Sequence, residues 1–189
     1  MPRILVPTLA DAPAQSKATL EAVTQRLGWT PSLFLLMAMN PNTLAAFLGL
    51  QGPLAKTMDI KMIEAMGMAV SEGSGCEYCL QSHTFLGLRY AKLDAAELAL
   101  NRQGTSRDPK RAVAVRFAKI IADTRGKVSD SDLTEMRAAG FTDADIVAVA
   151  GLTAQFLMTN FMNNIAQLEP DFPAIDRSEN EAVHASDRP

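Results

Sequence analysis

Apolar residues recur along the chain at the spacing of a helix face, and stretches that alternate apolar and polar residues, as strands do, are missing. Capping side chains precede prolines at Thr30, Asn40 and Asp108, where helices should begin, and glycines such as Gly28 and Gly140 mark helix ends. The pattern therefore predicts an all-α helical bundle of about eight or nine helices. The expected segments are residues 13–27, 31–38, 41–50, 59–72, 76–91, 94–102, 109–125, 130–139 and 142–167.

The last of these segments is the longest and is apolar on most of its circumference, which is typical of a central helix. Gln155 and Asn160 interrupt its apolar stretch, so we expect it to be too short and too polar to cross a membrane. Residues 173–189 are polar and charged and should form a loose tail after a single domain over residues 1–172. The methionines are expected to fill the core or a subunit interface.

Composition and charge narrow the class of protein. The 189 residues are 48% apolar and 21% charged, which is typical of a globular domain and excludes a disordered or fibrous chain. The formal net charge is −3 and basic residues do not cluster, so no nucleic-acid-binding surface is expected. The first residues lack the apolar core of a signal peptide, which favours a cytoplasmic protein. In that reducing compartment a close cysteine pair is more often redox-active or metal-binding than structural.

The two cysteines lie close together in residues 74–83, directly after a glycine that predicts a helix start. At about 100° per residue, Cys76, Cys79 and His83 share one helical face, with His83 one turn from Cys79. The helix N-terminus, the imidazole and the paired sulfur all favour the thiolate, which is the form that attacks peroxides and disulfides. Tyr78, between the cysteines, could serve packing or could place a hydroxyl near the sulfurs.

Two carboxylates occur in the preceding segment. Glu64 falls inside an apolar stripe that includes Ile63 and Gly67, so it should face the neighbouring helix that carries the cysteines. A carboxylate that loses hydration in this way could take and return a proton during catalysis. Glu72 lies two turns further on, at the helix end, and is expected to be wetter and at most a neighbour of the site.

Less specific interpretations stay open on the residues alone. The cysteines could be two small buried hydrophobes, His83 a core histidine and Glu64 a surface acid. A zinc site could use Cys76, Cys79 and His83, but it lacks a fourth ligand, because the other histidine, His184, lies in the tail.

Taken together, Glu64, Cys76-x-x-Cys79 and His83 resemble the signature of the alkyl hydroperoxidase D-like (AhpD-like) proteins, in the carboxymuconolactone decarboxylase superfamily, and most of all its peroxidase-related branch. The resemblance implies a thiol-dependent peroxidase with a redox core over residues 59–167. Cys79 would be the peroxidatic thiol, and Cys76 the proton donor and resolving thiol that closes a Cys76–Cys79 disulfide. Glu64 and His83 would form the proton relay. The best-known members have His immediately before the second cysteine, where this chain has Tyr78.

The resemblance also implies the partners. The protein would assemble into homo-oligomers, trimers or hexamers, and would bind no cofactor, metal, nucleic acid or membrane. Electrons would come from an external dithiol, either a lipoyl protein or thioredoxin, and a peroxiredoxin would be a further partner. The alternative functions are a thiol-disulfide oxidoreductase whose oxidant is not a peroxide, and a redox sensor or adaptor that uses the same cysteine pair.

Overall fold

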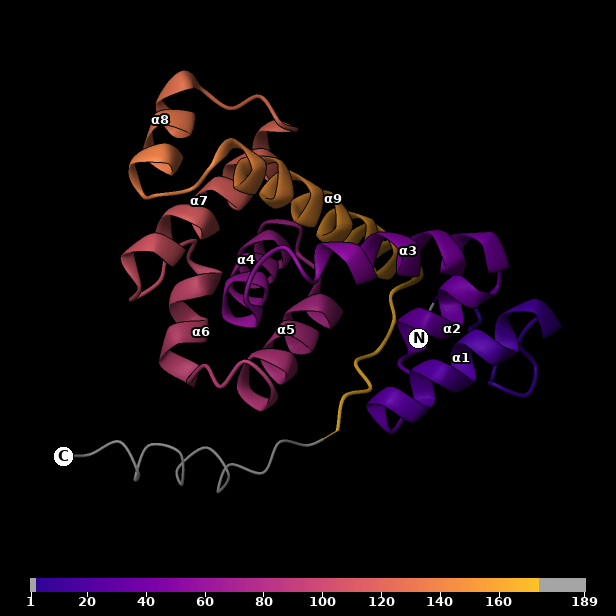
Figure 1. Cartoon of the computed structure of the whole chain (residues 1–189). Coiled ribbons are helices and arrows are strands. Elements are labelled where there is room, and N and C mark those ends of the chain that lie inside the picture. Colours follow the sequence, from indigo (N-terminus) through magenta and orange to yellow (C-terminus); the bar gives the residue numbers. More distant parts are fainter. Residues whose placement is uncertain (1–2, 174–189) are drawn as a thin grey trace.

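The computed structural model describes residues 3–173. The predicted tail from residue 174 onwards, with His184, lies outside the described residues. Within residues 3–173 every regular element is a helix, which confirms the all-α prediction (Figure 1). The helices are α1 (Ala14–Leu27), α2 (Ser32–Ala38), α3 (Pro41–Leu54), α4 (Ile60–Gly73), α5 (Glu77–Arg89), α6 (Ala95–Arg102), α7 (Pro109–Thr124), α8 (Asp130–Ala138) and α9 (Asp143–Ala166).

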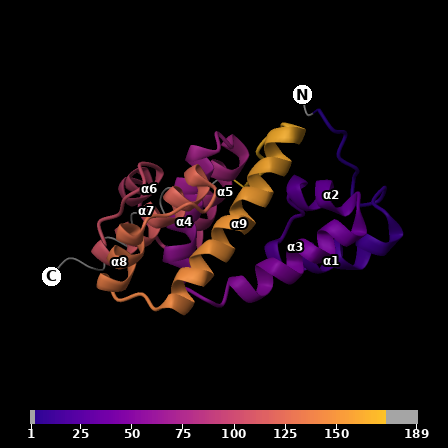
Figure 2. The same ribbon diagram turned by 90° about the horizontal axis from the view of Figure 1, so that it is seen from above.

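The helices form two groups that flank α9. Figure 2 shows α9 crossing the middle of the molecule, with α1 to α3 on one side and α4 to α8 on the other. Helix α4 contacts α5, α6, α7 and α9, and every residue from 64 to 71 is buried. The methionines of α4 are therefore core residues, as predicted, with Met66 and Met68 almost fully enclosed. The last helix, α9, is predicted to be the central one, but α4 is more enclosed than α9, so the two helices share this position.

Helix α9 is apolar on an outer face as well as on its buried side. Val147, Phe161 and Ile165 are 72%, 58% and 62% exposed, whereas Asn160 and Asn163 are buried. Contrary to the expectation from the sequence, α9 is long and apolar enough, by length and composition alone, to cross a membrane. It has 24 residues, and an 18-residue window within it has a mean hydropathy of 1.3. Core helices of soluble proteins pass the same test, and α9 packs against helices of both groups.

Most helix starts follow the local signals in the sequence. The side chains of Asn40 and Asp108 accept hydrogen bonds from the first turns of α3 and α7, as predicted. The start predicted at Thr30 is wrong, because its hydroxyl pairs with a neighbouring threonine and α2 begins two residues later, at Ser32. The amide and the hydroxyl of Ser32 instead donate to the carboxylate of Asp171, at 2.7 and 2.6 Å. A carboxylate from the other end of the chain thus caps α2 in place of the local hydroxyl.

Helix α3 continues to Leu54, beyond the predicted end at residue 50. Pro53 lies in its last turn, and a proline ring normally clashes with the side chain of the residue before it. That residue is Gly52, which has no side chain, so the helix can continue through the proline. The additional turn brings Gln51 to the wall of the cavity described below.

Candidate active site

The cysteine pair lies at the start of α5. Gly75 has a φ of +59°, a left-handed conformation that glycine adopts without strain, and Cys76 follows as the N-cap of the helix. The backbone amide of Cys79 donates to Sγ of Cys76 at 3.3 Å, and the two residues are joined as a disulfide. Cys76 is fully buried and Cys79 is 3% exposed. Both sulfurs therefore lie where the partial positive charge of a helix N-terminus favours a thiolate after reduction.

Glu64 of α4 and His83 of α5 form a buried pair. Nδ1 of His83 donates to Oε2 of Glu64 at 2.7 Å, and the two residues are only 9% and 6% exposed. The expected burial of Glu64 on the face toward α5 is therefore correct. Gly67, one turn along α4, lies directly under the imidazole, and a Cβ there would be well inside van der Waals distance of the ring. Phe156 of α9 contacts the ring edge-on, with centroids 5.3 Å apart, so His83 is enclosed by three helices.

The polar contact of the Cys79 sulfur comes from Asn163, a residue that the sequence analysis did not single out. Nδ2 of Asn163 donates to Sγ of Cys79 at 3.3 Å, and Asn163 is 3% exposed. A neutral amide that donates to sulfur stabilises the thiolate over the thiol.

Two neighbouring asparagines hold α9 against the segment that leads into the cysteines. Asn160 donates to the hydroxyl of Ser71 at 3.2 Å, and Asn164 donates to the backbone carbonyl of Ser74 at 2.8 Å. The available signal was the occurrence of several asparagines at the end of an otherwise apolar helix. Buried amides require partners, so such residues indicate a polar contact in the core.

Tyr78 connects the cysteine helix to the segment after α9. Its hydroxyl donates to Oδ1 of Asp171 at 2.9 Å and accepts from the amide of Leu33 at 3.4 Å. Burial, followed by the negative charge of Asp171, raises the pKa of the Tyr78 phenol, which therefore stays protonated. The ring packs against Phe172, with centroids 5.1 Å apart. Of the two roles left open for Tyr78, the structure supports packing, together with a hydrogen bond to Asp171.

Glu72 lies away from this cluster. It is exposed, as expected, and its carboxylate accepts from Nε of Arg102 at 2.8 Å. The structure therefore does not bring Glu72 into the site. Within residues 3–173, no group of three or more His, Cys, Asp and Glu side chains is arranged to hold a metal ion.

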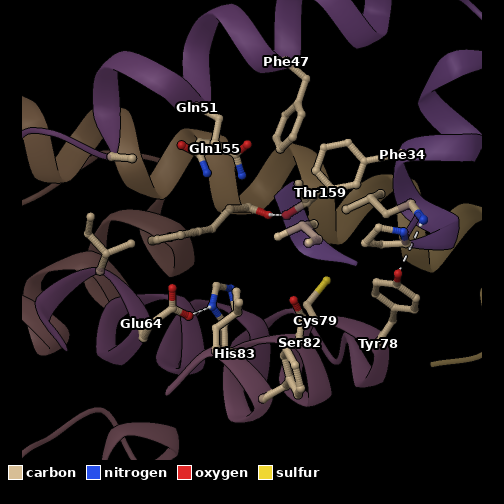
Figure 3. Close-up of a pocket in the computed structure, with 18 of the residues that line it drawn as sticks. Phe34, Phe47, Gln51, Glu64, Tyr78, Cys79, Ser82, His83, Gln155 and Thr159 are labelled. Carbon is tan, nitrogen blue, oxygen red and sulfur yellow. Dashed lines mark hydrogen bonds and ion pairs between the residues drawn. The ribbon is translucent and has the colours of Figure 1, made fainter. Parts of the chain in front are cut away.

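A cavity of about 570 Å³ lies above the buried pair and the cysteine helix. Figure 3 shows Glu64, His83 and Cys79 on one wall, and side chains from α3 and α9 on the wall opposite. The lining is mostly apolar and aromatic, and Cys79, but not Cys76, contributes to it. A molecule in this cavity would therefore meet Cys79 first, next to the imidazole. Gln51, Gln155 and Thr159 are polar residues of the opposite wall, and Asn163 of α9 also lines the cavity.

The comparisons with known proteins bear on the fold of the chain. No protein-family model and no curated protein matches the chain. An alkylhydroperoxidase AhpD core, described as an uncharacterized peroxidase-related protein from Ralstonia eutropha, has 27% sequence identity and a TM-score of 0.80, with 90% of this chain and 92% of that chain covered.

Two further structures are similar to this chain. A peroxidase-related protein from a Silicibacter species has 24% identity and a TM-score of 0.77, over 90% of this chain and 92% of that chain. The debrominase Bmp8 without ligand has 20% identity and a TM-score of 0.73, over 88% and 90%. The resemblance suggested by the motif is thus confirmed for the fold. This chain has the all-α fold of the AhpD-like, peroxidase-related proteins.

Proposed function

We propose that the protein is a thiol-dependent peroxidase that reduces hydroperoxides through a cycle between the Cys76/Cys79 dithiol and its disulfide. The similarity to peroxidase-related structures supports an oxidoreductase of the antioxidant, peroxidase-like kind. The observation that carries the finer proposal is the cavity, where the sulfur of Cys79 lies on the same wall as the hydrogen-bonded pair of Glu64 and His83.

In the first step, His83, supported by Glu64, takes the proton of the Cys79 thiol. The Cys79 thiolate then attacks one peroxide oxygen, so that a sulfur–oxygen bond forms while the oxygen–oxygen bond breaks. The leaving alkoxide takes the proton of the Cys76 thiol and departs as an alcohol, or as water when the substrate is hydrogen peroxide. Cys79 is now a sulfenic acid and Cys76 a thiolate. The hydrogen bond from Asn163 to Sγ of Cys79 stabilises the attacking thiolate.

In the second step, the Cys76 thiolate attacks the sulfur of the Cys79 sulfenic acid. The disulfide forms and hydroxide leaves, taking the proton held by the His83–Glu64 pair to become water. The two cysteine Cα atoms are 5.3 Å apart, which is within the usual range for a disulfide. The sulfurs do not have to come from different subunits.

An external dithiol then reduces the disulfide and is itself oxidised. Because Cys76 is fully buried and Cys79 is 3% exposed, access is through the cavity. A slender dithiol arm, such as the lipoyl group of a lipoylated protein, fits such an entrance better than the flat surface around a thioredoxin cysteine does. We therefore propose a lipoyl protein as the reductant and thioredoxin as the alternative.

The test is peroxide consumption with dihydrolipoamide, thioredoxin or glutathione as reductant, measured side by side. We expect turnover to be fastest with dihydrolipoamide and to be lost in Cys79→Ser. The Cys76→Ser variant should consume about one equivalent of peroxide and leave a sulfenic acid that dimedone traps on Cys79. A wild-type rate in Cys79→Ser would refute the assignment. Rapid disulfide exchange without peroxide turnover would favour the alternative, a thiol-disulfide oxidoreductase.

A further inference from the structure

Gln155 of α9 is a buried polar residue that the proposed chemistry does not use. It is 7% exposed and lines the cavity, on the wall opposite Glu64 and His83 (Figure 3). Its Oε1 atom is buried and accepts no hydrogen bond from the part of the chain that the structure describes. Asn160 and Asn163 of the same helix also have a buried Oδ1 atom without a hydrogen-bond partner among the described residues, but their Nδ2 groups donate to Ser71 and Cys79. Asn163 also lines the cavity, but its amide donates to the Cys79 sulfur, which leaves Gln155 as the lining carboxamide of α9 that is available to a ligand.

An unpaired amide in an apolar wall destabilises the protein. The loss of its hydrogen bonds to water is not compensated when no partner replaces them. A leucine at this position would avoid that penalty and would pack against the same neighbours. A ligand group that enters the cavity can satisfy this amide.

The neighbouring side chains indicate what kind of group binds. Gln51 of α3 lines the same wall of the cavity as Gln155 and provides a second carboxamide (Figure 3). The hydroxyl of Thr159 donates to the carbonyl of Phe156 at 2.8 Å, so it can offer a ligand only acceptor lone pairs. Two neutral amides offer donors and acceptors together, which suits an uncharged hydroxyl group.

The rest of the cavity indicates the body of the ligand. Its remaining walls are largely apolar, with aromatic rings from α2, α3, α5 and α9 and from Trp29 and Phe172. A volume of about 570 Å³ is in the range of pockets that bind whole small molecules and is far larger than hydrogen peroxide requires. Charged side chains are confined to exposed positions such as Arg26 and Lys56, apart from Glu64 beside His83.

We infer that the substrate is a bulky, neutral organic hydroperoxide with an aromatic or branched body and a hydroxyl group at the end remote from the peroxide. The hydroxyl group binds Gln155, with Gln51 on the same wall, while the peroxide end faces Cys79 and His83. This inference rests on the proposed peroxidase function, because it names the substrate of the same site. The step itself is unchanged: the peroxide becomes the corresponding alcohol and the cysteines become a disulfide.

Binding can be measured without turnover by calorimetry on the oxidised protein, with alcohols that correspond to the product. We compare cumyl alcohol with its para-hydroxymethyl and para-carboxy derivatives. The hydroxymethyl derivative should bind about tenfold more tightly than cumyl alcohol, the value of one well-made neutral hydrogen bond. In Gln155→Leu the two alcohols should bind with about equal affinity. It should persist in Gln81→Leu, a matched change on the exposed side of α5.

Turnover then separates the two proposals. The ratio of kcat/KM between para-(hydroxymethyl)cumene hydroperoxide and cumene hydroperoxide should be about ten in the wild type and about one in Gln155→Leu. Equal binding of cumyl alcohol and its hydroxymethyl derivative would overturn the inference whatever the enzyme turns over. Tightest binding of the carboxy derivative would also overturn it, in favour of an anionic ligand held by Arg26 or Lys56. A retained binding preference without turnover of any peroxide would refute only the peroxidase function. Gln155→Met provides a second, unbranched apolar variant if Gln155→Leu does not fold.

Discussion

Replacing Glu64 by Gln tests whether the buried pair of Glu64 and His83 serves as a proton relay. The substitution preserves the volume, and the amide oxygen can still accept the hydrogen bond from Nδ1 of His83. It removes the negative charge and the ability to bind a proton. Because the two residues are 6% and 9% exposed and their atoms are 2.7 Å apart, water cannot replace the carboxylate. The imidazolium that forms when Cys79 loses its proton would then lack its counter-charge.

The magnitude follows from the strength of that contact. A buried hydrogen bond to a charged group contributes about 1.5–3 kcal/mol, which corresponds to about 10- to 150-fold in rate. We expect thiol alkylation and peroxide turnover to slow by about 100-fold in Glu64→Gln. Glu72→Gln is the matched control, because this acid is exposed and pairs with Arg102 outside the cavity. Its effect should be no more than about threefold.

The assay is the rate of alkylation of the reduced protein by iodoacetamide, with peroxide consumption measured in parallel, both as a function of pH. Both rates should fall together in Glu64→Gln if one relay serves deprotonation of the thiol and release of hydroxide. A larger loss in Glu72→Gln would show that the relay has been assigned to the wrong carboxylate. Wild-type rates in Glu64→Gln would show that the pair has only a structural role.

Three further outcomes are expected. Mild peroxide should lower the mass of the reduced protein by about 2 Da without producing a covalent dimer, since the disulfide forms within the chain; a dimer on a non-reducing gel would contradict this. Light scattering should give a mass at least twice the 20.4 kDa of one chain. The Phe161→Glu variant should have a lower mass, because Phe161 is 58% exposed on the apolar outer face of α9. A monomeric wild type would refute the reasoning. Burial raises the pKa of the Glu97 carboxyl, but hydrogen bonds from Ser106, Arg107 and Asn101 outweigh it and lower the pKa from 4.5 to about 2. The ionised Glu97 carboxylate therefore contributes fully to stability above about pH 5, and this contribution is lost as the pH falls from 4.5 toward 2. In urea unfolding, the difference in free energy of unfolding between the wild type and Glu97→Gln should shrink over this range. A difference that does not change with pH would contradict this.

The elements of the fold could be predicted where the signals are local. Asn40 and Asp108 cap the helix that follows them directly, so the sequence alone locates those starts. The cap of α2 could not be found in this way, because the carboxylate of Asp171 comes from 139 residues further along the chain. The outcome there depends on competition between a nearby hydroxyl and a distant charge, which only the packed structure decides.

The residues of the site also fall into those that local signals predict and those that depend on packing between helices. Helical periodicity was sufficient to place Glu64 in the core and to put His83 on the face of the cysteines, because both statements concern one helix at a time. It could not identify Asn163 or Gln155, although both are polar residues in an apolar helix. Their roles depend on how α9 is rotated against α5 and α3. That rotation is set by packing between elements far apart in the sequence, and no local pattern encodes it.

The glycine under the imidazole has a consequence for finding this arrangement in other sequences. His83 can approach α4 closely enough to meet Glu64 because position 67 carries a hydrogen atom where any other residue has a carbon. A search pattern that requires only the acid, the cysteine pair and the histidine would also accept chains in which a side chain at this position holds the ring away from the acid. A pattern that also requires a glycine three residues after the acid would select chains in which the histidine ring can approach the acid closely enough to form the hydrogen bond.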